Sequence, residues 1–332
     1  VRQMRASILV LGPLLASKGS AKVPLPGGCA IGSRPIDLHV MVMEALGANI
    51  IFDSGFIIAS LGNKGLKGAV IDFPIVSVGA TESAIMTSVL AQGQTKILNA
   101  AREPEVTDLA NCLNKAGADI KGIGTDLLII NGVKELNKVS HSVVSDRIEA
   151  GSFAIATSIT MGNVEINNIN PKDLTEFINV LKLTGTKIEI SDNSMKVSCS
   201  NRPKPYNVVT NPYPGFPTDL QAQYMALMAI ADGTALIKET IFENRFMHVP
   251  ELMRMGAKIF TNHQEAEICG VKKLKGAKVM ASDLRASMCL ILGALAASGT
   301  SEIDGLYHLD RGYENLEDKL TNLGAIIERS NN

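Results

Sequence analysis

The most reactive side chain in this sequence is a cysteine in a loop of small residues. Cys29 lies among glycines at positions 27, 28 and 32, and it precedes Arg34 by five residues. Glycines let the backbone approach a ligand closely, and a nearby guanidinium activates a thiol and binds phosphate or carboxylate. This pattern is typical of a cysteine that transfers a proton or forms a covalent adduct. The alternative is a buried structural cysteine beside a turn.

A set of arginines recurs at matching positions in distant parts of the chain. Arg34 and Arg311 each lie 13 residues before a glycine of the repeat described below. Arg5 and Arg285 each begin an Arg-Ala-Ser sequence at an expected helix start, where backbone N–H groups favour anions. A single exposed arginine is usually only solvated. Four at equivalent positions predict a shared anionic ligand.

The elements that must position these residues are repeated along the chain. Five helix-like segments end in glycine, two further residues and isoleucine, and successive glycines are 68 to 71 residues apart. A glycine just past a helix, followed by a β-branched residue, predicts a helix cap and then a strand. This spacing indicates internal duplication. The five glycines are Gly47, Gly117, Gly185, Gly256 and Gly324.

Each repeat is expected to contain two helices and several strands. An alanine-rich helix follows a polar start, as at Asp146–Gly151 or Thr218–Gln221. A strand such as Lys96–Leu98 and a second helix such as Asp108–Ala116 come next. Because such a unit cannot bury both its faces alone, the units must stack. The sequence therefore predicts an α/β fold in which the aliphatic helix residues form the core.

The N-terminal segment Val1–Ala16 has the basic and apolar regions of a signal peptide. Its Arg-Ala-Ser start and its apolar run recur at Arg285–Ser298, so we interpret it as a structural element. No apolar run approaches the ~20 residues that a membrane-spanning helix needs.

The composition argues against several classes of function. A chain of 332 residues can form two domains, and a net charge of −1 provides no field for nucleic acid or an acidic membrane. The five cysteines form no CxxC pair, which fits a reducing cytosol, and the five histidines form no metal-binding pattern. We expect a cytoplasmic protein without a metal site.

Five longer strings resemble those of the UDP-N-acetylglucosamine 1-carboxyvinyltransferase family, which are enolpyruvyl transferases. The resemblance covers essentially the whole chain. The strings are Leu25–Pro35, Asn99–Glu105, Phe216–Gln223, Glu239–Leu252 and His308–Glu314.

The resemblance implies an inside-out α/β barrel of six repeated βαβαββ-type units in two lobes, with substrates between the lobes. Five repeats are visible here, so we expect residues 1–143 to form an incomplete N-terminal lobe and residues 144–332 a complete C-terminal lobe. The first repeat of the family includes a Lys-Asn pair at the active site, and nothing in this chain replaces it. We therefore expect residues 1–332 alone not to turn over.

The implied reaction transfers the enolpyruvyl group of phosphoenolpyruvate to the 3′-hydroxyl of UDP-N-acetylglucosamine, releases phosphate and needs no cofactor. Cys29 looks like the acid that protonates the methylene carbon, and Asp219 matches the aspartate next to the sugar hydroxyl. Without the resemblance, Thr218-Asp219 would be interpreted as an ordinary helix cap.

The remaining predicted site residues bind the two substrates by the same resemblance. The expected phosphoenolpyruvate ligands are Arg34 and Arg311, with Arg285 and Arg245 nearby. The positions that match ligands of the UDP-sugar are Arg5, Pro35, Ile36, Asp37, Leu38, Ser77, Val78, Gly79 and Ile241.

Two alternatives remain open from the sequence. One is 3-phosphoshikimate 1-carboxyvinyltransferase, which has the same architecture and donor but no counterpart of the Cys29 loop. The other is a truncated, inactive remnant that at most binds the UDP-sugar.

Overall fold

The computed structural model describes residues 5–25 and 36–330 and consists of two compact units, which meet in the sequence between Val144 and Ser145. Each unit has its own hydrophobic core. The predicted site residues Cys29, Arg34 and Pro35 lie outside the described residues, as does the side chain of Arg5.

The five repeat glycines have the backbone conformation that the sequence predicts. Their φ angles lie between 92° and 100°, a region that residues with a side chain rarely adopt. A strand begins one or two residues after each of the first four glycines: β2 (Ala48–Asp53), β6 (Asp119–Lys121), β9 (Lys187–Ile190) and β13 (Lys258–Asn262). The strand predicted after Gly324 is wrong, since residues 325–330 are not in a strand. Ile326 is fully exposed there, so this segment has no sheet to join.

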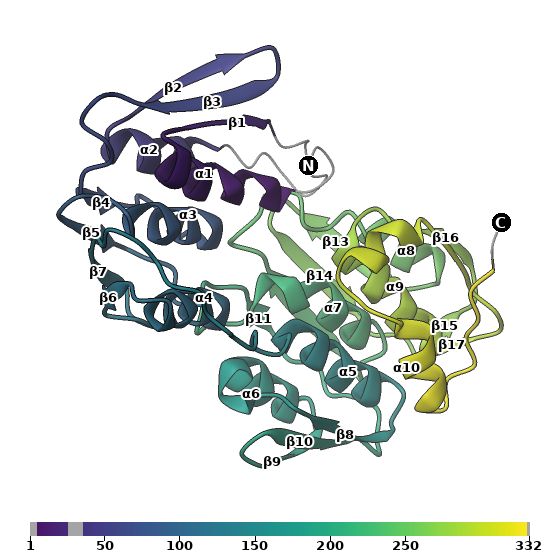
Figure 1. The fold of residues 1–332 in the computed structure, drawn as a ribbon. Coiled ribbons are helices and arrows are strands. Elements are labelled where there is room, and N and C mark those ends of the chain that lie inside the picture. The colour runs from purple at the N-terminus through teal and green to yellow at the C-terminus, as the bar shows by residue number, and fades with distance from the viewer. Residues whose placement is uncertain (1–4, 26–35, 331–332) are drawn as a thin grey trace. The chain divides into compact units, whose positions relative to one another are not determined.

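The N-terminal unit contains two repeats, each with a small sheet (Figure 1). The first has sheet order β1-β3-β2 and the second β4-β5-β7-β6, in which β4 pairs in parallel with β5 and the other pairs are antiparallel. The elements of the first repeat are η1 (Arg5–Val10), α1 (Leu11–Lys18), β1 (Ser20–Pro24), α2 (Asp37–Ala45), β2 and β3 (Phe56–Leu61). Those of the second are β4 (Val70–Asp72), α3 (Val78–Ser88), β5 (Gln94–Leu98), α4 (Pro104–Lys115), β6 and β7 (Leu127–Asn131).

The segment that resembled a signal peptide forms η1 and α1. Leu11 and Leu15 of α1 are completely buried, and α1 packs against α3. No helix within the described ranges is long and apolar enough to cross a membrane.

The C-terminal unit contains three repeats. The sheet of its first repeat has order β8-β10-β9, and that of its second has order β11-β12-β14-β13, which repeats the arrangement of β4 to β7. The first two repeats contain α5 (Arg147–Ile159), β8 (Asn163–Asn167), η2 (Pro171–Leu174), α6 (Thr175–Leu183), β9, β10 (Ser194–Ser198), β11 (Val208–Val209), η3 (Thr218–Leu220), α7 (Gln221–Ala229), β12 (Thr234–Lys238), α8 (Val249–Arg254), β13 and β14 (Glu265–Cys269).

The last repeat has two short parallel strand pairs, β15 with β17 and β16 with β18. Its elements are β15 (Leu274–Lys275), β16 (Lys278–Met280), α9 (Leu284–Leu295), β17 (Ala297–Ser298), β18 (Glu302–Asp304), η4 (Leu306–Arg311) and α10 (Leu316–Asn322).

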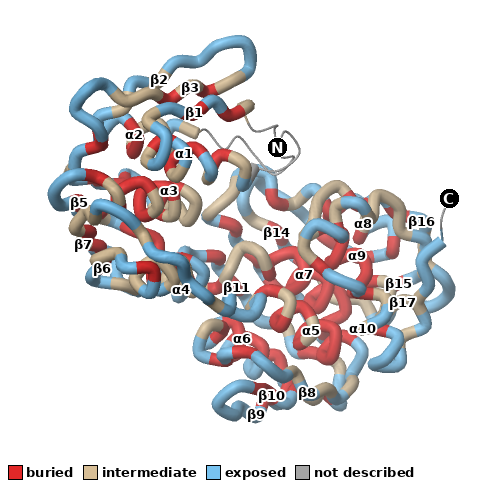
Figure 2. The backbone as a smooth tube through the Cα atoms, viewed as in Figure 1, coloured by how far each residue is buried: buried red, intermediate tan, exposed pale blue. Residues whose placement is uncertain are grey.

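Helix α7 lies at the centre of the C-terminal unit, where it packs against both α5 and α9 (Figure 2). All nine of its residues are buried, as the predicted aliphatic core requires. Two of them, Gln221 and Gln223, are polar and completely buried. Because burying an amide is costly unless it forms hydrogen bonds, the side chain of Gln223 is expected to have hydrogen-bond partners nearby.

Candidate active site

Asp219 lies between two arginines that come from distant parts of the C-terminal unit. Its Oδ1 is 2.6 Å from Nη2 of Arg245, and its Oδ2 is 2.9 Å from Nη2 of Arg285. The arginine side chains are only 4% and 15% exposed, whereas that of Asp219 is 40% exposed. The two arginines therefore hold the carboxylate on its buried side, and the carboxylate is still accessible to a ligand. We call these three residues the Asp219 cluster.

Asp219 does not cap a helix, although its sequence context allowed that interpretation. It lies inside η3, and α7 begins at Gln221 after Leu220, which forms no capping bond through its side chain. The arrangement of Asp219 is better explained by its two arginines.

The Asp219 cluster has an excess of one positive charge in a poorly hydrated setting. Burial is the largest single influence on Arg285 and acts to lower its pKa, but Asp219 together with Tyr313 and Asp146 outweighs burial and raises the pKa. Arg285 therefore stays protonated, and Nε of Arg245 is buried without a hydrogen-bond acceptor among the described residues. Such a site favours an anionic ligand.

A buried glutamate joins the segment of Asp219 to that of Ile241. Glu239 is completely buried; its Oε2 accepts from the Thr218 hydroxyl at 2.9 Å. Its Oε1 accepts from the backbone N–H groups of Ile241 and Phe242 at 2.8 and 3.1 Å. One carboxylate thus fixes two loops that both contain predicted site residues.

Arg311 is the last residue of η4 and is not at a helix N-terminus, which corrects the expectation for its loop. It is exposed and lines an open cavity of about 500 Å³. Tyr313, two residues later, lies close enough to Arg285 that the arginine's charge acts to lower the tyrosine's pKa. The structure thus connects the backbone of Arg311 to the Asp219 cluster through Tyr313.

The N-terminal unit brings two of the predicted UDP-sugar segments together. Asp37 and Leu38 begin α2, and Ser77 caps α3 by accepting the N–H of Ala80 at 3.3 Å. His39 connects the two helix starts. Its Nδ1 is 2.7 Å from Oγ of Ser83, and a Cβ on Gly79 would lie 3.4 Å from its ring. Ile36, Leu38 and Val78 pack against the core of this unit.

Comparison with known proteins identifies the family. The sequence profile of EPSP synthase (3-phosphoshikimate 1-carboxyvinyltransferase) matches residues 1–320. Two proteins named UDP-N-acetylglucosamine 1-carboxyvinyltransferase are similar over 99% of this chain: one from Zymomonas mobilis is 54% identical and one from Geobacter metallireducens 55%. The chain spans 77% and 78% of their lengths. The chain belongs to the EPSP synthase family of enolpyruvyl transferases.

Solved structures of enolpyruvyl transferases have the same fold. The enolpyruvyl transferase NikO from Streptomyces tendae superimposes with a TM-score of 0.84 at 24% identity, covering 96% of this chain and 76% of that one. An EPSP synthase from Acinetobacter baumannii gives 0.69 at 19% identity, again over 96% of this chain and 76% of that one. These comparisons confirm the predicted fold class and the resemblance to the enolpyruvyl transferase family.

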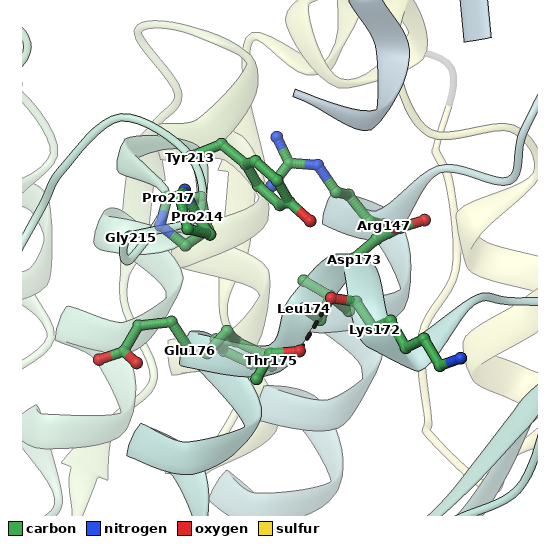
Figure 3. A pocket seen from close by; sticks show the side chains of 11 residues that line it. Arg147, Lys172, Asp173, Leu174, Thr175, Glu176, Tyr213, Pro214, Gly215 and Pro217 are labelled. Atoms are coloured by element: carbon green, nitrogen blue, oxygen red, sulfur yellow. Dashed lines mark hydrogen bonds between the residues drawn. The ribbon is translucent and has the colours of Figure 1, made fainter. Parts of the chain in front are cut away.

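A second cavity of this enolpyruvyl transferase lies beside the loop that leads to Asp219 (Figure 3). It has a volume of about 220 Å³ and is lined by α6 and by the segment Tyr213–Pro217. The guanidinium of Arg147 lies 5.5 Å from the ring centroid of Tyr213. None of the predicted site residues lines this cavity, and we assign it no role in the reaction.

Sequence reasoning missed the residues that support the Asp219 cluster. Glu239, Gln223 and Tyr313 each lie within or directly beside a string that resembles the family, but no local pattern distinguishes them from exposed polar residues. Among the residues that the structure describes, no group of three potential metal ligands gathers at one place.

Proposed function

We propose that this chain transfers the enolpyruvyl group of phosphoenolpyruvate to the 3′-hydroxyl of UDP-N-acetylglucosamine and releases phosphate. The observation that supports this most strongly is the 54–55% identity, over 99% of the chain, to proteins named for that activity. Similarity to the 3-phosphoshikimate enzymes of known structure is far lower, at 19–20% identity.

In the proposed reaction the sugar oxygen bonds to C2 of phosphoenolpyruvate while C3 gains a proton, which gives a tetrahedral ketal. The C2–O bond to phosphate then breaks as C3 loses a proton, and the enol ether and phosphate leave. Asp219 accepts the hydroxyl proton, and the two arginines beside it favour the ionised form that can do so. Cys29 donates the proton to C3, and Arg34, Arg245, Arg285 and Arg311 balance the phosphate and carboxylate charges.

The UDP-sugar is proposed to bind at Arg5, at Pro35–Leu38 and Ser77–Gly79, and beside Ile241. We place the reaction in the cytoplasm, as the first committed step of peptidoglycan synthesis, on which cell shape and division depend. No cofactor takes part in the proposed chemistry.

A substrate exchange tests the proposal. With phosphoenolpyruvate as donor, this chain combined with the family's first repeat as a second polypeptide should release phosphate when UDP-N-acetylglucosamine is added and not when shikimate 3-phosphate is added. The opposite preference would assign the chain to the shikimate reaction. Binding of the UDP-sugar in calorimetry, without phosphate release, would identify a sugar-binding protein without transferase activity.

The proposed role of Cys29 gives a prediction about thiol reactivity. Fosfomycin, an epoxide analogue of the donor, should label Cys29, and faster in the presence of UDP-N-acetylglucosamine. Of the four described cysteines, Cys199 and Cys289 are buried, and burial raises the pKa of Cys289, so neither competes well. Peptide mapping should find the adduct on Cys29 in wild type and in Cys112→Ser, and no adduct in Cys29→Ser. An adduct on any other cysteine contradicts the assignment.

A further inference from the structure

Tyr313 is a buried tyrosine whose hydroxyl connects three elements of the C-terminal unit. The residue is 3% exposed, and its hydroxyl oxygen lies 2.8 Å from Oγ of Ser152 on α5. Nε2 of Gln223 on α7 lies 3.5 Å from the same oxygen, and the charge of Arg285 on α9 acts to lower the pKa of this hydroxyl.

The direction of each hydrogen bond follows from its partners. Oγ of Ser152 lies 2.8 Å from the backbone oxygen of Ile148, which can only accept, so the Ser152 hydroxyl donates there. Ser152 must then accept from Tyr313, and Nε2 of Gln223 lies within 3.3 Å of the Ser152 oxygen and 3.5 Å of the tyrosine oxygen. Burial raises the pKa of Tyr313, with the charge of Arg285 acting in the opposite direction, so the phenol keeps the proton that it donates.

The neighbours of the Tyr313 hydroxyl also hold Asp219, one through its side chain and the other through its backbone. Arg285 donates to the Asp219 carboxylate at 2.9 Å, and Nε2 of Gln223 donates to the Asp219 backbone oxygen at 2.9 Å. The Tyr313 hydroxyl thus lies beside the arginine that holds the Asp219 side chain and the glutamine that holds its backbone.

The same tyrosine fixes the turn that contains Arg311. The Tyr313 N–H donates to the backbone oxygen of Leu309 at 3.0 Å, which closes the turn. A Cβ on Gly312 would lie 2.8 Å from a methyl carbon of Leu284, so the turn packs tightly against the start of α9. Arg311 itself is exposed, and only its backbone is restrained by these contacts.

We propose that Tyr313 is a positioning residue that sets Arg311 relative to Arg285 and Asp219 and thereby tightens the binding of the donor's phosphate. The inference rests on the proposed function, because it assumes that these arginines bind phosphoenolpyruvate. Positioning of this kind has a large effect, since a misplacement of about 1 Å can cost about 10²-fold in rate.

The test compares two tyrosines that lose the same atom. Tyr313→Phe removes the hydroxyl from the network described above. Tyr224→Phe is the matched control, because Tyr224 is also buried and its hydroxyl donates to the backbone oxygen of Tyr206 at 2.8 Å. Tyr307→Phe, at a 69% exposed position of η4, controls for changes near Arg311.

Both buried variants should lower the melting temperature to a similar extent. Only Tyr313→Phe should lower kcat/KM for phosphoenolpyruvate, by about tenfold or more, while KM for the UDP-sugar changes less than twofold. Equal losses for the two substrates, or a value for phosphoenolpyruvate within twofold of wild type, would overturn the proposal. If Tyr313→Phe does not fold, Ser152→Ala removes the acceptor of the tyrosine and should give a weaker form of the same pattern.

A second readout does not depend on turnover. Titration with inorganic phosphate in the calorimeter should show binding about tenfold weaker in Tyr313→Phe and unchanged in Tyr224→Phe. If wild type binds phosphate but releases none from phosphoenolpyruvate and UDP-N-acetylglucosamine, the proposed function fails while the role of Tyr313 is still decided by this titration. Equal phosphate affinity in all variants contradicts the positioning role.

Discussion

Replacing Asp219 by asparagine, in the enzyme that includes the family's first repeat, should lower kcat by about 10²–10⁴-fold, the usual contribution of a general base. An asparagine has the same shape, but its amide cannot accept the proton of the sugar hydroxyl. It also offers only one oxygen to two arginines, which now donate separately to Oδ1 and Oδ2. We therefore expect a smaller secondary rise in KM for phosphoenolpyruvate as one guanidinium loses its partner.

The control for Asp219→Asn is a second aspartate–arginine pair on the surface of the same unit. Asp232 is 2.8 Å from Arg202, and its side chain is 75% exposed, so Asp232→Asn should leave kcat unchanged. Phosphate release under saturating substrates provides the measurement. Turnover of Asp219→Asn within a few-fold of wild type would mean that Asp219 only orients the arginines.

Local features of the fold could be predicted from the sequence because they depend on a few neighbouring residues. The five repeat glycines are examples. The turn that follows each helix requires a positive φ, which glycine adopts readily, and all five glycines have it. The strand after Gly324 shows the limit of such reasoning. Its residues resemble those of the other repeats, but a strand also needs a partner, and the exposed Ile326 has none in the described part of the chain.

The Asp219 cluster could be predicted only residue by residue and only from the family resemblance. Arg245 and Arg285 are 26 and 66 positions from Asp219, and their meeting depends on how α7 and α9 pack. No periodicity in the sequence encodes that packing in advance. The supporting residues were harder still to find, because Gln223 is a polar residue on a helix that is buried on every side.

Arg285 should be the more sensitive of the two arginines to replacement, because it lies beside both Asp219 and the buried Tyr313 hydroxyl. Its guanidinium donates to the Asp219 carboxylate and its charge acts to lower the pKa of Tyr313, whereas Arg245 donates to the Asp219 carboxylate and to the backbone oxygen of Thr218. Arg285→Ala removes a preorganised cation from the donor site, which should lower kcat/KM for phosphoenolpyruvate by about 10²–10³-fold.

Arg285→Lys separates the charge of the guanidinium from its shape. A lysine keeps the positive charge, but its single ammonium cannot reproduce the planar guanidinium that lies beside both Asp219 and Tyr313. We expect it to recover part of the loss and to remain at least about tenfold below wild type, if bridging contributes beyond charge. Arg254→Ala is the control, since that arginine pairs with Glu251 at 3.3 Å and is 60% exposed. Full activity of Arg285→Lys would show that only the charge matters, and near-wild-type activity of Arg285→Ala would remove Arg285 from the donor site altogether.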